Sequence, residues 1–111
     1  KPKPTDLDPR PDLPEDHRRW MAVLSIAWHR NRDLWGLLHG LRCGGARLET
    51  QRSRDGREFF KLDYRALLDV WDKETLIRDW LNPNRDAMRD LFHLAPRFVR
   101  SVEADLARKA G

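Results

Sequence analysis

The stretch Gly44–Tyr64, GGARLETQRSRDGREFFKLDY, decides the fold, because its pattern differs from the helical spacing on either side of it. An Asp55-Gly56 pair between alternating residues is typical of a β-hairpin. A two-residue loop would mix core and solvent positions on each face of that hairpin. A three-residue loop over 54–56 instead gives Gly56 the left-handed position and pairs Ser53 with Arg57. We therefore predict the three-residue loop.

This loop also sorts the side chains of the two strands into two different faces. One face pairs Ala46 with Tyr64, Leu48 with Leu62, Thr50 with Phe60 and Arg52 with Glu58, and the other pairs Arg47 with Asp63, Glu49 with Lys61 and Gln51 with Phe59. The first face is largely apolar, and three of the pairs join opposite charges. Cross-strand pairs of this kind contribute about 0.2–1 kcal/mol each. The register therefore favours a hairpin over about residues 46–64.

The segment before the hairpin has the spacing of an apolar helix face. Asn31 and Asp33 interrupt that spacing, so residues 15–43 form either one long helix or two helices broken near Asn31, which would cap the second. Both alternatives end at Gly44 and Gly45, which are typical of a helix C-terminus. The apolar positions are Trp20, Leu24, Trp28, Leu34, Trp35, Leu38 and Leu41.

The chain opens with KPKPTDLDPRPDLP, which holds most of its seven prolines. Proline fixes φ and lacks a backbone donor, so we expect residues 1–13 to be a flexible tail or linker. Asp12 is the expected N-cap of the first helix, with Pro14 in its first turn. Residues 14–111 are expected to form a single domain, and a chain that begins with Lys is expected to be part of a larger protein.

Helical spacing returns after the hairpin. We expect Pro83 at the first position of one helix and Pro96 at the opening of the last. The predicted fold class is α+β, mainly α, with a helical scaffold that carries one two-stranded antiparallel hairpin followed by three short helices. The apolar stripes are Leu67, Leu68 and Trp71; Leu76, Ile77, Trp80 and Leu81; Met88, Leu91, Phe92 and Ala95; and Val99, Val102 and Leu106.

The five tryptophans allow two interpretations. At helical spacing, large aromatic side chains most often form the core, and this is our prediction. The alternative is an exposed groove for a partner. The residues concerned are Trp20, Trp28, Trp35, Trp71 and Trp80.

Composition limits the function classes. The 22 basic and 18 acidic residues give a net charge of +4, which permits nucleic-acid binding without requiring it. Cys43 is the single cysteine, so an internal disulfide is excluded. No apolar run has the length of a membrane span, and no signal-peptide pattern is present. We expect a cytoplasmic protein without a membrane partner.

Catalytic and metal chemistry have little support in the sequence. His39 and Cys43 stand one helical turn apart, as two metal ligands would, but no further ligands follow at a recognisable spacing. Gly44 and Gly45 precede a predicted strand rather than a helix, which excludes a phosphate-binding loop of the usual kind. We predict a protein that is not an enzyme and has no cofactor or metal.

Nucleic-acid binding is one of two functions that the basic hairpin allows. The residues that would contact phosphates are Arg42, Arg47, Arg52, Arg54 and Arg57. The predicted register pairs Arg47 and Arg52 with acidic residues, which leaves Arg54 and Arg57 as the free charges.

Protein docking is the other function, and the one we favour. The outer edges of a two-stranded ribbon carry unpaired backbone groups that a partner strand can bind. Arg57, Phe59 and Lys61 alternate onto one face of the second strand, and Arg54 lies in the adjacent loop. These residues suit an acidic, partly apolar peptide. A purely structural or regulatory segment is a third possibility, and the oligomeric state is left open.

The segments LWGLLHGLRCGGARLETQ, GREFFKLDY, ALLDVW and WLNPNRDAMRDLF follow one another as helix, hairpin, helix and helix. This order resembles the TubC-like αββαα docking domain found at the N-terminus of tubulysin-type synthetase subunits. The resemblance covers about Asp33 to Leu94. It implies a non-catalytic domain whose hairpin receives a short, often acidic, peptide along its second strand, here Arg57 to Lys61. The matching positions of the helix-to-strand junction are Leu38, Leu41, Arg42, Gly45, Arg47 and Leu48.

Overall fold

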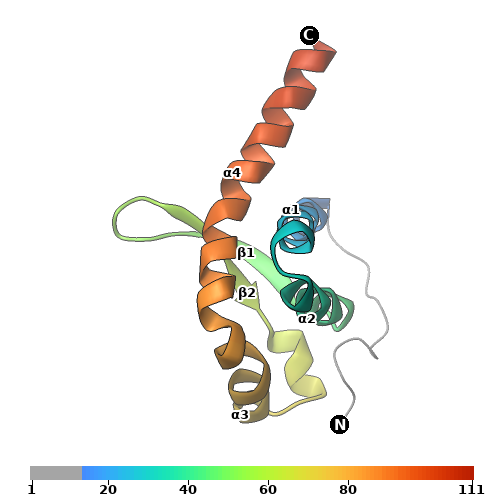
Figure 1. Ribbon diagram of the computed structural model, residues 1–111, viewed down its shortest axis with the longest axis vertical. Coiled ribbons are helices and arrows are strands. Elements are labelled where there is room, and N and C mark those ends of the chain that lie inside the picture. Colours follow the sequence, from blue (N-terminus) through green and yellow to red (C-terminus); the bar gives the residue numbers. More distant parts are fainter. Residues whose placement is uncertain (1–13) are drawn as a thin grey trace.

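A computed structural model describes residues 14–111, and it has the predicted class, α+β and mainly α (Figure 1). Two helices precede the hairpin, and a nearly continuous helical run follows it. The expected tail over 1–13 lies outside the described residues, and so does Asp12, the expected N-cap of the first helix. The elements are α1 (Pro14–Arg30), α2 (Arg32–Cys43), β1 (Arg47–Arg52), β2 (Glu58–Asp63), the 3₁₀ helix η2 (Arg65–Asp69), α3 (Lys73–Thr75), the π-helical η3 (Leu76–Leu81), the 3₁₀ turn η4 (Asn82–Asn84) and α4 (Arg85–Ala110).

The segment before the hairpin forms two helices, because Asn31 caps the second. The Asn31 side-chain oxygen accepts a hydrogen bond from the Leu34 N–H at 3.1 Å. At the other end of α2, Gly45 has φ 97°, which glycine adopts without steric cost. The Ala46 N–H then reaches the Leu41 carbonyl at 3.0 Å, which closes the helix in a Schellman motif. The glycines therefore turn the chain directly into β1.

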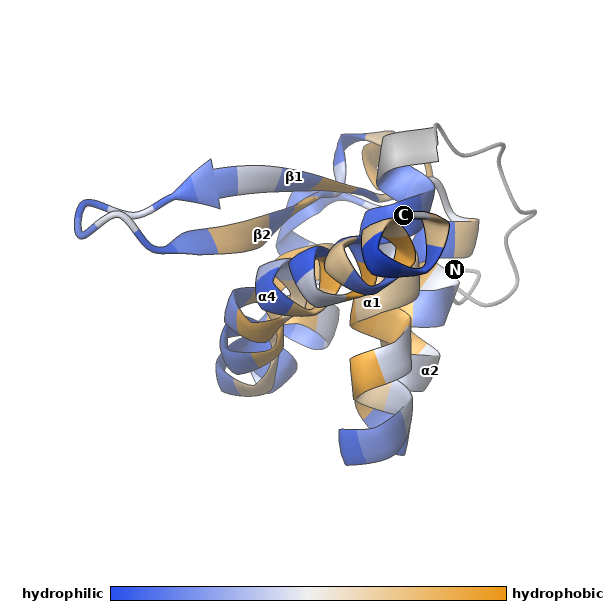
Figure 2. Ribbon diagram, turned by 90° about the horizontal axis from the view of Figure 1, so that it is seen from above, coloured by the Kyte–Doolittle hydropathy of each residue, from blue (hydrophilic) through white to orange (hydrophobic). Residues whose placement is uncertain are grey.

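The hairpin has the predicted register and loop. Leu48 lies opposite Leu62, and the Ser53 N–H donates to the Arg57 carbonyl at 2.9 Å. Gly56 takes φ 84°, as the three-residue loop requires. Leu48, Phe60 and Leu62 are buried, so one face of the ribbon packs on the helices. The end that holds the loop projects from the helices and is hydrophilic (Figure 2).

The core lies where α1, α2, the sheet and the first half of α4 meet. Trp20 and Trp71 are fully buried, which confirms the core interpretation for these two side chains. That interpretation is wrong for Trp28, which is 40% exposed. Trp28 lies near the end of α1 and is covered by Trp35 on one side and by the Arg32 guanidinium, 3.6 Å from its ring centre.

Side chains of α1 bind the outer edge of β1 as a neighbouring strand would. The Asp16 carboxylate accepts a hydrogen bond from the Leu48 N–H at 3.0 Å, and Arg19 donates to the Leu48 carbonyl at 2.9 Å. The Trp20 indole N–H donates to the Ala46 carbonyl at 3.2 Å. Both outward backbone groups of Leu48 are therefore satisfied, and α1 is fixed against the sheet.

Replacing Asp16 with Ala should lower the free energy of unfolding by about 1–3 kcal/mol. The carboxylate is only 5% exposed, and its loss leaves the Leu48 N–H buried without that acceptor. Urea unfolding followed by circular dichroism measures the change. Asp33→Ala, in the exposed first turn of α2, is the control and should change stability by less than about 0.5 kcal/mol. Equal effects of the two substitutions would show that α1 is not held by this bond.

The last helix differs from the prediction, because α4 continues through Pro96. Proline removes one backbone hydrogen bond, but Ala95 and Pro96 are buried against the rest of the domain, and their burial offsets the lost bond. The axis of α4 changes direction about midway along its length (Figure 1). Val99 still packs against the core, and every residue of the helix from Ser101 onward is exposed. The predicted apolar residues Val102 and Leu106 are therefore exposed, Leu106 by 61%.

Candidate functional site

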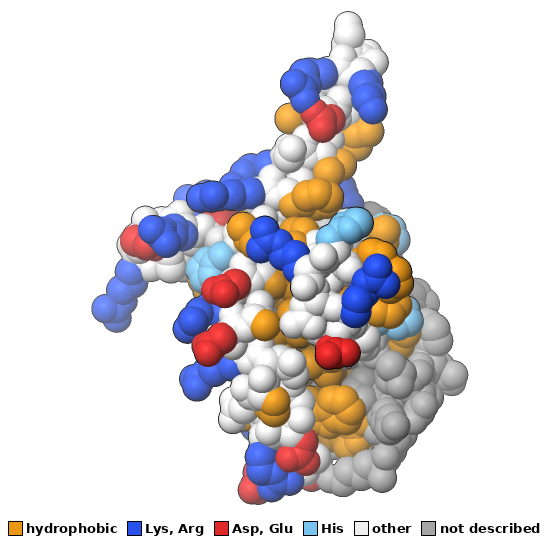
Figure 3. Space-filling view, in the orientation of Figure 1, with side chains coloured by type: hydrophobic (Ala, Val, Ile, Leu, Met, Phe, Trp, Pro, Cys, Tyr) orange, Lys and Arg blue, Asp and Glu red, His pale blue; other side chains and the backbone are white. Residues whose placement is uncertain are grey.

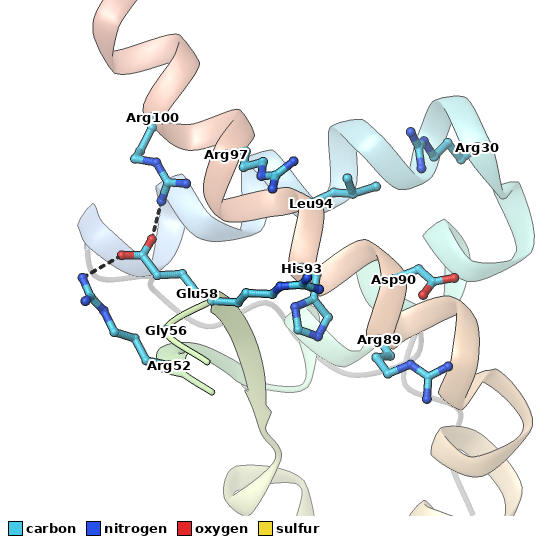
Figure 4. Close-up of a pocket in the computed structure, with 11 residues that line it drawn as sticks. Arg30, Arg52, Gly56, Glu58, Arg89, Asp90, His93, Leu94, Arg97 and Arg100 are labelled. Atoms are coloured by element: carbon cyan, nitrogen blue, oxygen red, sulfur yellow. Dashed lines mark hydrogen bonds and ion pairs between the residues drawn. The ribbon is translucent and has the colours of Figure 1, made fainter. Parts of the chain in front are cut away.

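A cleft of about 860 Å³ is lined by the hairpin, α4 and the end of α1, and arginine dominates its lining (Figure 4). His93, Leu94, Glu58 and Asp90 also line it. Six guanidinium groups against two carboxylates leave an excess of four positive charges, without counting the histidine. The six arginines are Arg30, Arg52, Arg57, Arg89, Arg97 and Arg100.

The three arginines of α4 that line the cleft, at 89, 97 and 100, share one side of the helix with His93, because these four positions are separated by three or four residues. Arg89 forms an ion pair with Asp86 at 3.3 Å. Within the described residues, Arg97 makes no ion pair or hydrogen bond, and the same holds for Arg30 at the end of α1. These two guanidinium groups are therefore available to a ligand. Lys and Arg side chains gather where the hairpin meets α4 (Figure 3).

Glu58 joins the two walls of the cleft. One of its carboxylate oxygens accepts from Arg52 of β1 at 3.2 Å, as the predicted cross-strand pair requires. The other oxygen is bonded to Arg100 of α4 (Figure 4). The Glu58 side chain is 29% exposed, so this carboxylate lies at the surface of the cleft between two guanidinium groups.

The loop of the hairpin corrects one prediction. Arg57 was expected to be a free charge, but its side chain pairs with Asp55 at 3.2 Å. The Ser53 hydroxyl and the Arg57 backbone N–H both donate to the Asp55 carboxylate, and they lower its pKa below the usual value. The pairing arises because Asp55 sits in the turn two residues before Arg57. Arg54 is exposed and makes no such pair within residues 14–111.

The second strand is partly engaged by α4. The Phe59 ring lies against the His93 ring, with ring centres 5.4 Å apart. Phe59 is therefore at the border of the cleft and half-buried. Lys61 is exposed and lies outside this cleft, beside a smaller hollow that Tyr64 and Leu68 also line.

Two of the predicted charge pairs have the predicted register, but their carboxylates bond to a third residue, Arg65. Asp63 is bonded to Arg65 at 2.6 Å rather than to Arg47, its partner in the register. Glu49 pairs with the same Arg65 at 3.5 Å. Arg65 follows β2 by only two residues, so the chain brings it back beside both carboxylates. Its hydrogen bonds lower the pKa of Asp63.

Only some of the arginines that were predicted to bind nucleic acid line the cleft. Arg52 and Arg57 line it, whereas Arg42, Arg47 and Arg54 do not. Arg42 instead contacts His17 of α1 at 3.1 Å. The sequence reasoning missed Arg30 and all of the α4 arginines. The spacing of Arg89 and Arg97 was the available signal, but a helix start at Pro96 placed them on different elements.

No group of three or more His, Cys, Asp or Glu side chains in residues 14–111 is placed to hold a metal ion. No helix in that range is both long and apolar enough to cross a membrane. Comparison of the chain with models of protein families, with curated proteins and with solved structures found no match.

Proposed function

We propose that this protein is a non-catalytic binding module that docks an acidic segment of a partner protein in the arginine-rich cleft. The observation that carries the proposal is the set of six arginines around one cleft beside β2. Arginine presents a planar fork of donors that matches a carboxylate, so a cluster of arginines favours acidic ligands.

The backbone beside the cleft supports the binding of an extended segment. Leu48 directs its N–H and carbonyl to α1, away from β2. In an antiparallel pair, its partner Leu62 must direct its own groups away from β1, and so must Phe60 and Glu58 by alternation. Glu58 lines the cleft, whereas Phe60 and Leu62 are buried. A segment in the cleft can therefore reach the outer edge of β2 at Glu58, on the strand that the TubC-like resemblance implies for docking.

The lining also favours spaced carboxylates over a continuous polyanion. Glu58 and Asp90 place negative charge within the cleft, and Leu94 with the His93 and Phe59 rings offers apolar surface. A peptide that alternates acidic and apolar residues matches both features. A nucleic-acid strand carries a charge on every phosphate and would pass close to both carboxylates.

Fluorescence anisotropy with short labelled probes tests this function. The probes are a peptide of alternating Glu and Leu, its Gln counterpart, and single- and double-stranded DNA, each titrated across a salt series. We expect the Glu peptide to bind, the Gln peptide to bind much more weakly, and salt to weaken the binding. Tighter binding of DNA than of the Glu peptide would support the nucleic-acid alternative. No binding of any probe at low salt would contradict both functions.

Arg97→Ala should weaken binding of the Glu peptide at least about tenfold, because one charge-assisted hydrogen bond contributes about 1.5–3 kcal/mol. Arg97 has no partner within the described residues, so its removal leaves no buried charge unpaired. The control is Arg78→Ala, which removes the same charge from an ion pair with Asp79 outside the cleft. Equal losses in the two variants would mean that net charge, rather than the cleft, attracts the peptide.

A further inference from the structure

The Glu58 carboxylate occupies a two-arginine anion site that the protein makes from separate elements. Arg52 comes from β1 and Arg100 from the second half of α4, and each bonds a different oxygen of Glu58. Figure 4 shows the carboxylate between the two guanidinium groups, at the edge of the cleft. The Arg52 and Arg100 side chains are both more than half exposed, so an external anion can reach them. Arg97 lies one helical turn before Arg100.

An acidic ligand that enters this site must exchange with Glu58. A ligand carboxylate would only replace one carboxylate with another, with the same charge and the same number of acceptor oxygens. A phosphate monoester carries a charge of about −1.5 to −2 at pH 7 and three acceptor oxygens. It therefore gains bonds and charge from the exchange, and Arg97 is a further donor beside the site.

We infer that the docked segment is recognised through a phosphorylated side chain, which displaces Glu58 from Arg52 and Arg100. This inference rests on the proposed function and names the chemistry of its ligand. Glu58 acts as an internal competitor that lowers the affinity of every anion by the same factor, and the phosphate monoester is preferred because its own bonds to the two arginines are stronger. A phosphodiester carries a single charge and has no such advantage over Glu58, so the geometry favours a phosphopeptide over a nucleic-acid backbone.

Three labelled peptides with the same acidic sequence and Ser, Glu or phosphoserine at one central position test the inference. We expect the phosphoserine peptide to bind about tenfold tighter than the Glu peptide, and the Ser peptide to bind weakest. Equal affinity of the phosphoserine and Glu peptides would overturn the inference and leave the proposed function intact. Failure of all three peptides to bind would contradict the proposed function itself.

Glu58→Gln tests the competitor role directly. The amide keeps the shape of the side chain but not its charge, so the Glu peptide and the phosphoserine peptide should both gain affinity, by a similar factor, because each displaces the same competitor. Asp90→Asn is the matched control, because it removes a charge from the same cleft. Asp90 is bonded to neither Arg52 nor Arg100 in residues 14–111, so this substitution should raise the two affinities less. A gain in Glu58→Gln no larger than that in Asp90→Asn, with folding verified by circular dichroism, would overturn the role of Glu58.

Competition by a DNA strand that bears a 5′-phosphate tests whether the phosphate must be attached to a peptide. If it displaces the phosphoserine peptide no better than the same strand without the phosphate, recognition requires the peptide, as we infer. If the 5′-phosphate strand displaces the labelled peptide as well as unlabelled phosphopeptide does, the site binds phosphate monoesters whether they are attached to a peptide or to DNA. That outcome would overturn the assignment of a protein ligand.

Discussion

Replacing Trp20 with Ala is expected to lower the free energy of unfolding by about 4–8 kcal/mol, a large part of the stability of a domain. The Trp20 side chain is fully buried, and its indole N–H donates to the Ala46 carbonyl at the start of the sheet. Loss of a buried tryptophan costs about 3–5 kcal/mol, and the unpaired carbonyl adds about 1–3 kcal/mol. A domain has only about 5–15 kcal/mol of stability in total. Thermal unfolding followed by far-ultraviolet circular dichroism measures the effect.

Two further variants separate the causes of this effect. Trp20→Phe keeps most of the volume but loses the donor, so it should be intermediate between the wild type and Trp20→Ala. Trp28→Ala removes the same side chain from a position that is 40% exposed, and it should cost far less. If Trp28→Ala and Trp20→Ala were equally destabilised, the packing of α1 on the sheet would differ from that described.

The hairpin could be predicted because its determinants are local. The three-residue loop, the left-handed Gly56 and the pairing of Leu48 with Leu62 follow from turn geometry and strand alternation alone. The helix break at Asn31 is local too, since the cap needs only the N–H three residues on. For these features the sequence within a few residues contains all the necessary information.

The cleft could not be predicted because tertiary contacts create it. The continuation of α4 through Pro96 depends on burial against other elements, which local propensity does not describe. Arg30 and Arg100 lie far apart in the sequence and approach only when α1, α4 and the hairpin pack together. Asp63 lies opposite Arg47, as predicted, but it bonds to Arg65, whose position depends on the path of the chain after β2.

Reversing the charge of both Arg30 and Arg97 to Glu is expected to abolish binding of acidic peptides to the cleft, with a loss of at least about a hundredfold. Each reversal replaces an attraction with a repulsion, and near a protein surface two charges 4 Å apart interact by up to about 4 kcal/mol. Neither arginine has a partner within the described residues, so the exchange breaks no bond of the fold. The same titration of the labelled phosphoserine peptide measures the loss.

The control for this pair changes the net charge equally but away from the cleft. Arg47→Glu with Lys73→Glu alters two exposed positions, one on β1 and one at the start of α3. At 0.1 M salt, charges more than about 10 Å apart are largely screened from one another. At that ionic strength the control should therefore bind the peptide nearly as the wild type does. If the control lost as much affinity as the cleft variant, binding would follow the overall charge of the protein. If only the cleft variant lost affinity, the ligand must lie within contact distance of Arg30 and Arg97, in the cleft that α1, the hairpin and α4 line.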